Sequence, residues 1–200
     1  MKSLRSGMLS DAMDALGRVS NASGGFQISH PRLVTVGRAF TLRQVRQEEN
    51  PEGVARHGEA AKALIGPGDI LIIDTPDILD VATWGEGHTL RALASRAAGV
   101  VINGAVRDAA ALADHALPVL YRSVSPRRSK GRLVTAELGC AVDVCGVAIA
   151  PGDLVCFDAD GLAAIAPQDE DAILKEVETI QAWEAERDER LRTALESLAR

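Results

Sequence analysis

Two buried strands on either side of one helix restrict the possible folds of this chain most strongly. Residues 69–74, DILIID, form an apolar run after a glycine-rich turn, and residues 100–103, VVIN, form another. The segment between them repeats apolar residues at helical spacing, at Leu90, Leu93, Ala94 and Ala97. A strand, a helix and a strand in succession predict a parallel pair, with those four side chains on one face of the helix.

The rest of the chain extends this unit into an α/β fold. A short helix over residues 105–116 and a strand over 118–124 repeat the helix–strand order. After Pro126, short apolar runs alternate with Gly, Pro and Asp turns, which favours antiparallel pairing, and residues 157–161, FDADG, are interpreted as a hairpin turn. We therefore predict an α/β domain with parallel βαβ units first, antiparallel strands later and a C-terminal helix.

Turn residues and helix caps indicate the elements that precede this core. Ser10 is expected to cap a first helix that Gly17 ends. Residues 33–45 alternate as a strand does, and Gly37 is interpreted as a bulge or bend within it. Residues 51–66, which begin with proline and end with glycine, predict a second helix.

The chain ends in a charged helical segment that begins at Gln168. Its apolar stripe comprises Ile173, Val177, Ile180, Leu191, Leu195 and Leu198. Such a helix packs on its own domain or on a neighbouring subunit, and its charged middle is interpreted as a solvated face. The predicted organisation is one domain over residues 1–200, of which 168–200 form a charged helical extension.

Composition and charge argue against several classes of protein. The net charge of −6 disfavours non-specific nucleic-acid binding, which needs a basic face. The apolar runs are too short to span a bilayer, and the N-terminal residues lack a continuous apolar segment, so we expect neither a membrane span nor a secretory signal. The three cysteines are interpreted as free thiols buried in strands. These features predict a cytoplasmic protein.

The sequence WGEGH, residues 84–88, opens the helix of the βαβ unit. The first N–H groups of a helix lack internal acceptors, and glycines there let an anion approach them closely. The alternative is that Gly85 and Gly87 only permit a tight turn, with Glu86 favouring the first helical turn. His88 is either an acid–base group or a polar residue at a helix start, and its backbone N–H is the more interesting group.

Arg107 and Asp108 follow the second strand of the same unit. Because adjacent parallel strands end at one sheet edge, we expect this pair to lie beside the Gly85 turn. Arg107 can bind a carboxylate through two nitrogens, and Asp108 offers a hard oxygen ligand for Mg²⁺ or Mn²⁺, with Glu86 as a second carboxylate. The alternative is that Asp108 caps the next helix and Arg107 is its surface ion partner. None of the lysines, Lys62 aside, lies in a segment expected to be buried near this site.

Five motifs occur in an order that resembles a known family. They are SDAMDALG, GPGDILIID, WGE, GVVINGAVRD and PGDLVCFDADGLAAIAP, and they span residues 10–167. The series resembles the RraA-like family, which includes class II 4-hydroxy-4-methyl-2-oxoglutarate aldolases and a regulator of ribonuclease E. Its metal-dependent members share an acidic residue, a gap of twenty residues and then Arg-Asp, and Glu86 and Arg107 have this spacing.

The resemblance implies a role for each residue of this pattern. The substrate loop would comprise Gly85, Glu86, Gly87 and His88, and its last two backbone amides would bind the substrate carboxylate. Arg107 would contact the 2-oxo acid and stabilise its enolate. Asp108 would ligate the divalent metal, Mg²⁺ or Mn²⁺, and the glutamate would contact the metal through water. The chain departs from the family pattern at Ala111, where an acidic residue is common, and at the last two loop residues.

The implied activity is that of a divalent-metal-dependent lyase that cleaves a carbon–carbon bond of a 2-oxo acid and releases pyruvate. The 4-hydroxy-4-methyl-2-oxoglutarate aldolase reaction fits this description, and oxaloacetate decarboxylation would pass through the same enolate. The resemblance also implies a swivelling β/β/α fold and a homotrimer or homohexamer with sites at subunit interfaces. No nucleic acid or membrane partner is expected.

A non-enzymatic regulator that binds ribonuclease E or another protein partner is the alternative within the family. Those regulators lack the aspartate of the Arg-Asp pair, so Asp108 favours the enzyme. A methyltransferase name is also used for some proteins of this kind, but this sequence has no nucleotide-binding glycine pattern to support it.

Overall fold

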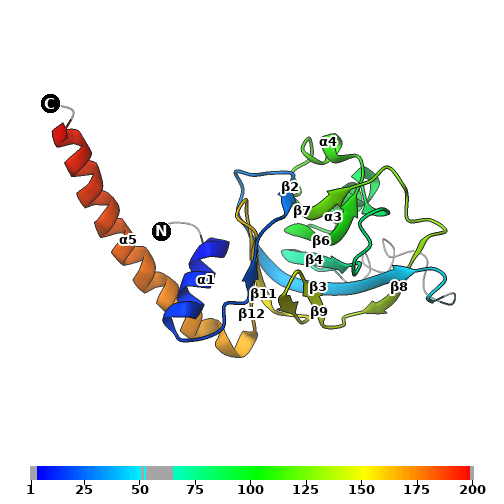
Figure 1. The fold of residues 1–200 in the computed structure, drawn as a ribbon, viewed down its shortest axis with the longest axis horizontal. Coiled ribbons are helices and arrows are strands. Elements are labelled where there is room, and N and C mark those ends of the chain that lie inside the picture. Colours follow the sequence, from blue (N-terminus) through cyan, green and yellow to red (C-terminus); the bar gives the residue numbers. More distant parts are fainter. Residues whose placement is uncertain (1–3, 51, 53–64, 199–200) are drawn as a thin grey trace.

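A mixed β-sheet with helices on its sides forms the body of the protein (Figure 1). The structure is a computed structural model that describes residues 4–50, 52 and 65–198. Within these residues the large sheet has ten strands, ordered β1-β12-β11-β3-β4-β6-β7-β2, with β5 beside β6 and β8 beside β3. The strands of this sheet are β1 (Ala22–Ser23), β2 (Gln27–Ile28), β3 (Thr35–Arg46), β4 (Asp69–Asp74), β5 (Ala82–Trp84), β6 (Gly99–Val106), β7 (Val119–Val124), β8 (Leu133–Leu138), β11 (Leu154–Phe157) and β12 (Leu162–Ile165).

The predicted parallel units form the centre of this sheet. Strands β3, β4, β6 and β7 are parallel neighbours, and α3 (Glu86–Ala94) and α4 (Ala109–Leu112) connect the later ones. One sheet face packs under these two helices, with Ile73, Ile102 and Leu112 in its core. The other face packs under a separate hairpin of β9 (Val142–Val144) and β10 (Val147–Ile149). The sheet is therefore buried on both sides, which explains its continuous apolar strands.

The later strands pair antiparallel, as the sequence predicts. Strand β11 pairs with β3 and β12, and β8 pairs with the far end of β3. The FDADG sequence forms the turn between β11 and β12, in which the Asp158 N–H donates to the Gly161 carbonyl at 3.0 Å. A side chain at Gly161 would overlap the Ser23 carbonyl, and its φ is +144°, so only glycine fits there. The α/β fold class with a C-terminal helix is confirmed.

The predicted apolar face of α3 packs on the core only in part: Leu93 contacts the core and Ala97, just after the helix, is buried in it. Leu90 is 51% exposed and Ala94 is also exposed, whereas Thr89 and Ala92 are the buried residues of the helix. Thr89 is buried because its hydroxyl accepts a hydrogen bond from Trp84 Nε1 at 2.9 Å. A satisfied polar side chain therefore takes the core position that apolar spacing assigned to leucine.

Two further expectations about the early elements are corrected, and one lies outside the described residues. Helix α1 (Ser6–Ala15) begins four residues before the predicted cap, so Ser10 lies inside it. Gly37 forms no bulge: β3 is regular there and shifts register between Arg43 and Gln44. Gly37 is glycine because a Cβ would overlap the Gly68 carbonyl. The helix expected over residues 51–66 falls mostly on residues that the structure does not describe.

All three cysteines are free thiols, as expected, but only one of them is buried in a strand. Cys156 is buried in β11, and burial raises the pKa of its thiol to about 12. Cys140 and Cys145 are half-buried and lie in turns next to β9, because the chain bends there between short strands.

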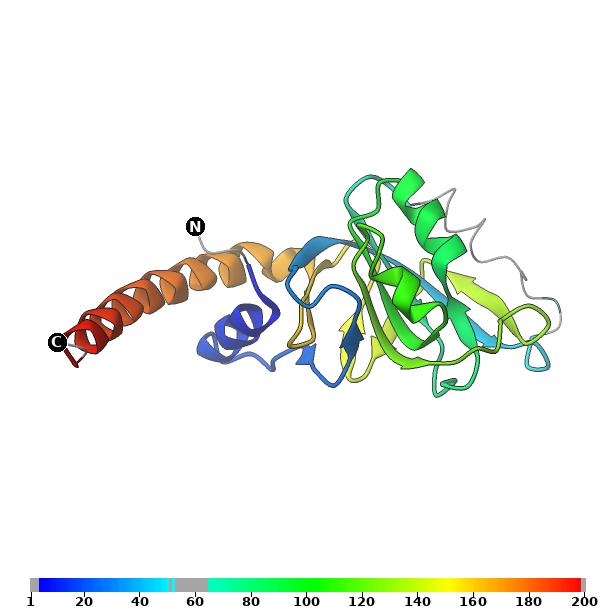
Figure 2. The same cartoon turned by 90° about the horizontal axis from the view of Figure 1, so that it is seen from above.

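Helix α5 (Glu170–Leu198) follows a short 3₁₀ turn, η1 (Pro167–Asp169), and extends away from the sheet (Figures 1 and 2). Ile173 and Val177 are buried against α1 and the outer strands. The later apolar residues are exposed, by 56% at Leu191 and 83% at Leu198. Only the first half of the predicted apolar stripe therefore packs on this chain. Among the described helices, none has the length and apolar composition to cross a bilayer.

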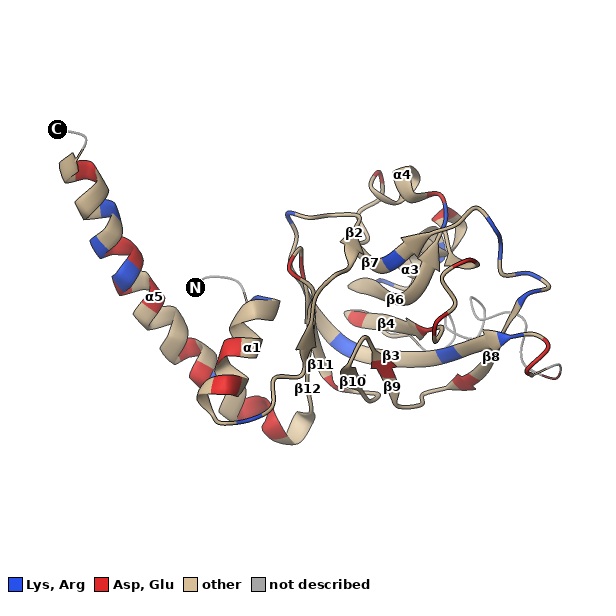
Figure 3. Cartoon of the chain, viewed as in Figure 1, with Lys and Arg blue, Asp and Glu red and all other residues tan. Residues whose placement is uncertain are grey.

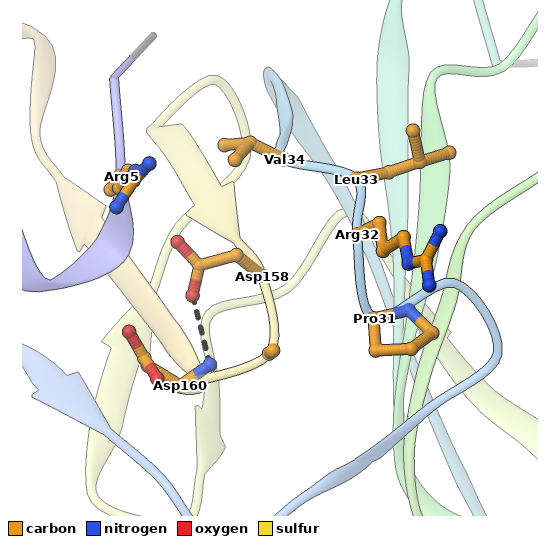
Figure 4. Close-up of a pocket in the computed structure, with 8 residues that line it drawn as sticks. Arg5, Pro31, Arg32, Leu33, Val34, Asp158 and Asp160 are labelled. Atoms are coloured by element: carbon orange, nitrogen blue, oxygen red, sulfur yellow. Dashed lines mark hydrogen bonds between the residues drawn. The ribbon is translucent and has the colours of Figure 1, made fainter. Parts of the chain in front are cut away.

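A hollow of about 210 Å³ lies where the N-terminus of α1 meets the β11–β12 turn (Figure 4). Asp158, 6% exposed, accepts hydrogen bonds from the Ser6 N–H at 2.9 Å and the Ser6 hydroxyl at 2.6 Å. A carboxylate at this place satisfies a helix N–H and interacts favourably with the helix dipole. The helix start is thus fixed by a residue 152 positions away, which local sequence does not reveal.

Replacing Asp158 with alanine should lower the free energy of unfolding by about 1–3 kcal/mol, because buried Ser6 donors lose their acceptor. Urea unfolding followed by circular dichroism measures the change. Asp160→Ala is the matched control: this exposed neighbour should change stability by less than about 0.5 kcal/mol. Equal effects of the two substitutions would contradict the capping role.

Candidate functional site

The two loops singled out in the sequence lie side by side at one sheet edge. Strand β5 pairs parallel with β6, with Trp84 opposite Val106, so the residues after each strand meet. The Arg107 N–H donates to the Trp84 carbonyl at 2.9 Å, and the Glu86 N–H donates to Asp108 Oδ2 at 3.3 Å. The arrangement places a guanidinium and a carboxylate against the first turn of α3.

Gly85 permits this close approach. A Cβ at Gly85 would lie 2.6 Å from Asp108 Oδ2 and 2.9 Å from Arg107 Cγ, so a larger residue would displace both side chains. Asp108 itself has φ +55°, in the left-handed region that asparagine and aspartate tolerate best among larger residues.

The geometry tests the two simpler roles of the Arg107–Asp108 pair, a helix cap and a surface ion pair. Asp108 occupies the position before α4, but its side chain makes no capping hydrogen bond there. Arg107 Nε lies 3.4 Å from Asp108 Oδ2, with the two side chains 45% and 41% exposed. The capping alternative is therefore wrong, and the ion pair is present. An ion pair this exposed adds little to stability, so stability does not explain its position.

His88 packs its ring against Trp84, with centroids 5.2 Å apart and planes tilted by 31°. Its backbone N–H donates to the Gly85 carbonyl at 3.0 Å. The expectation that this amide binds a substrate carboxylate is therefore not met in this arrangement, because the first turn of the helix already uses it. His88 lines the neighbouring hollow together with Trp84 and Arg107.

That hollow has a volume of about 210 Å³ and lies between the two loops and the segment after β7. Arg128, Ser129 and Lys130 form its other wall. The segment reaches this place because it pairs beside β5, with the Ala82 N–H donating to the Arg127 carbonyl at 2.7 Å. Lys130 therefore lines this hollow as an exposed residue, whereas the expectation concerned lysines in segments buried near the site. Three cationic side chains around one hollow favour an anionic ligand.

His115 is a further residue that sequence reasoning missed. Its Nε2 lies 3.0 Å from Glu86 Oε1, and its side chain is 22% exposed. No ligand or catalytic spacing links the two residues, which are 29 positions apart. Its contact with Glu86 depends on how the segment after α4 packs beside the start of α3, which spacing along the chain does not reveal.

The carboxylates suit a hydrated divalent cation better than a closed metal cage. Among the described residues, no three His, Cys, Asp or Glu side chains are grouped so that they could hold a metal ion. Mg²⁺ often binds through one or two carboxylates and keeps several waters. Asp108, which is 41% exposed, and Glu86, which is 47% exposed, provide such a donor set.

Comparison with known proteins identifies a family. The sequence profile of the RraA-like family, described as Aldolase/RraA, matches residues 7–163. The chain is 28% identical over 193 residues to protein DlpA of Legionella pneumophila, an alignment that covers 94% of this chain and 30% of DlpA. The chain therefore spans less than a third of the length of that relative.

Two further relatives carry informative names. One, from Halalkalibacterium halodurans, is provisionally named as a 4-hydroxy-4-methyl-2-oxoglutarate aldolase and is 29% identical, with coverage of 87% of this chain and 78% of that protein. The other is the RNA-processing inhibitor RraA from Thermus thermophilis, whose structure superposes with a TM-score of 0.66 at 28% identity, covering 82% of this chain and 93% of that one. Profile, sequence and fold agree, and the chain belongs to the RraA-like family.

Proposed function

We propose that this protein is a divalent-metal-dependent lyase that cleaves a carbon–carbon bond of a 2-oxo acid and releases pyruvate. The observation that carries the proposal is the contact of the Arg107–Asp108 pair with the Gly85–Glu86 turn beside a cationic hollow. The substrate class is that of 4-hydroxy-4-methyl-2-oxoglutarate, and oxaloacetate is a second substrate because its decarboxylation forms the same enolate.

Arg107 stabilises the charge that develops in this reaction. When the C3–C4 bond breaks, its electron pair moves toward C2 and leaves negative charge on the keto oxygen. A guanidinium already fixed beside that oxygen stabilises the enolate without reorganisation. Arg128 and Lys130 on the opposite wall attract the second carboxylate of a dicarboxylic substrate. Protonation of C3 then completes pyruvate.

Glu86 and His115 are proposed to handle the proton of the 4-hydroxyl group. Retro-aldol cleavage converts that hydroxyl to a carbonyl, so its proton must leave. A water held by Glu86 can accept it, and the 3.0 Å contact between His115 Nε2 and Glu86 Oε1 offers the next position for it. Trp84 and His88 form a ring-lined wall that limits water on one side of the hollow.

Asp108 is proposed to hold the divalent cation, with Glu86 contacting it through water. Bound there, Mg²⁺ or Mn²⁺ supplies Lewis acidity toward the carboxylate and keto oxygens of the substrate. Asp108→Ala should therefore abolish the stimulation of pyruvate release by Mg²⁺ and lower the rate by at least about 100-fold. Pyruvate released from 4-hydroxy-4-methyl-2-oxoglutarate is measured with a lactate dehydrogenase coupled assay, with Mg²⁺ or with EDTA.

Asp114→Ala is the matched control for this experiment. Asp114 is exposed and lies just after α4, so its removal changes the local charge equally but should leave the rate unchanged. Metal-stimulated activity that survives in Asp108→Ala would contradict the assigned ligand. A wild-type protein without metal-stimulated activity on this substrate or on oxaloacetate would overturn the lyase proposal itself.

A regulatory role is the second candidate function. One relative is named as an RNA-processing inhibitor, and α5 displays an exposed, highly charged surface away from the sheet (Figure 3). Under this proposal the protein binds ribonuclease E or another protein partner. Asp108 favours the lyase, because a surface that only binds protein does not require a carboxylate held against a glycine turn.

We also propose that the chain works as a homotrimer or homohexamer in the cytoplasm, without nucleic acid or membrane partners. Arg107 and Asp108 remain more than 40% exposed in the single chain, which leaves space for a neighbouring subunit to complete the pocket.

A further inference from the structure

A row of polar side chains ends the apolar sheet face that packs under the β9–β10 hairpin. The row comprises Arg43, Asp74, Asn103 and Arg122, on the neighbouring strands β3, β4, β6 and β7. One step earlier on the same face, the residues are Thr41, Ile72, Val101 and Leu120, all buried. The row therefore lies toward the carboxyl ends of four parallel strands, level with the last residue of β4, and α/β sheets commonly bind ligands at that side. The site proposed above lies beyond the ends of β5 and β6, and its hollow shares no lining residue with this row.

Hydrogen bonds hold the floor of this row rigidly. Asp74, with its side chain 3% exposed, accepts from Asn103 Nδ2 at 2.8 Å and from Arg43 Nε at 3.3 Å. Burial raises the pKa of Asp74, and these two hydrogen bonds act in the opposite direction. Arg43 also donates to the Ala141 carbonyl at 3.0 Å and to Glu137 at 3.2 Å. The charges of Arg43 and Asp74 are thus used within the protein.

A cavity of about 420 Å³ lies against this row. Its outer wall comes from Asp77, which follows β4, and from Asp143 and Cys145 in the β9–β10 hairpin. The hairpin is tied to the floor, because Asn103 Nδ2 also donates to the Asp143 carbonyl at 3.0 Å. The volume is within the range of small-molecule sites.

Arg122 is the cation of this cavity that has donors to spare. Across the described part of the chain, its guanidinium donates one hydrogen bond, to Asn103 Oδ1 at 3.3 Å, and no carboxylate lies within ion-pair distance of it. Asp77 and Asp143 are exposed residues of the wall, and Asp143 Oδ1 accepts a hydrogen bond from the Gly146 N–H at 2.8 Å, which leaves its other oxygen for a ligand. Arg122 would attract a simple anion, but these two carboxylates would repel it. The carboxylates would attract a simple cation, but Arg122 would repel it.

We infer that this cavity binds a small zwitterion, an amino acid whose carboxylate pairs with Arg122 and whose ammonium group pairs with Asp77 and Asp143. A guanidinium binds a carboxylate through two parallel hydrogen bonds, and carboxylates accept all three ammonium donors. Asn103, itself bound to Asp74, fixes the Arg122 guanidinium at one end of the cavity. The distance between the carboxylate and the ammonium group of the ligand therefore decides which amino acid binds.

Calorimetric titration of the full chain with four probes of similar size tests this inference. The probes are glycine, β-alanine, propionate and propylamine; the first two carry both charges at different separations, and the last two carry one each. We expect at least one of the two amino acids to bind at least tenfold more tightly than either single-charge probe. In amide NMR spectra, binding of the probe should shift the side-chain signal of Asn103, which locates the bound probe.

Arg122→Met keeps much of the side-chain volume and removes the charge, so the amino acid should bind about 10- to 100-fold more weakly. Arg190→Met, on the exposed face of α5, is the matched control and should bind as the wild type does. Binding that is unchanged in Arg122→Met, propionate binding as tight as that of the better amino acid, or the absence of binding by both amino acids would each overturn the inference. None of these measurements depends on lyase activity.

Discussion

Arg107→Gln should lower kcat/KM for pyruvate release by about 10²–10³-fold, which is the usual effect of removing one preorganised group that stabilises an oxyanion. The loss should appear mainly in kcat, because the enolate charge exists in the transition state and not in the substrate. Glutamine keeps a hydrogen-bonding side chain but is shorter and uncharged, so it removes the cation beside the developing oxyanion. Initial rates with saturating Mg²⁺ measure both constants.

Two companion variants make the Arg107 result specific. Arg107→Lys retains the charge but loses the planar pair of donors, so its rate should lie between those of the wild type and Arg107→Gln. Arg190→Gln removes a cation from α5 and should leave both constants unchanged. A loss confined to KM would indicate that Arg107 only binds the substrate, and a loss below about threefold would remove it from the chemistry.

Phe157→Ala should lower the free energy of unfolding by about 3–5 kcal/mol, the range for truncating a buried aromatic side chain. Phe157 is completely buried at the end of β11, within the core under the β9–β10 hairpin. Its ring packs on the flat backbone at Gly99, where a Cβ would lie 2.7 Å from the ring carbon Cζ. Gly99 has no side chain to fill the space that alanine leaves, so part of the cavity should persist.

Trp183→Ala is the control for Phe157→Ala, because it removes a larger aromatic group that is 56% exposed. Its effect should stay below about 0.5–1 kcal/mol, including its contact with the Arg187 guanidinium at 5.0 Å. Urea denaturation curves with a common slope compare the two variants. Similar midpoints for them would show that the ring of Phe157 is not part of a packed core.

The parallel centre of the fold could be predicted because its signals are local. Residues 69–74 and 100–103 are apolar without alternation, as expected for strands buried on both faces. The burial of Thr89 in α3 could not be predicted, because its hydroxyl pairs with Trp84 Nε1 and periodicity counts threonine as polar. The start of α1 was missed for a related reason, since its acceptor, Asp158, lies at the other end of the chain.

Part of the candidate site could likewise be predicted from the sequence, and part could not. The contact between the Gly85 turn and Arg107 followed from one topological rule, that neighbouring parallel strands end at the same edge. His115 and Lys130 reach that edge through loops whose course depends on tertiary pairing, such as the bridge between Ala82 and Arg128. Residue type and spacing carry no information about such a course.

The outer half of helix α5 extends the protein without contributing to the stability of the sheet. At about 1.5 Å per residue, its 29 residues extend roughly 43 Å, and only its first half is anchored by buried side chains. Substitutions beyond Trp183 can therefore change charge, apolar surface or length without disturbing a packed layer. Sequence changes in this outer half can therefore alter which molecules the protein binds while the fold of the sheet stays the same. It is the part of the chain where new contacts can evolve with the smallest loss of folding stability.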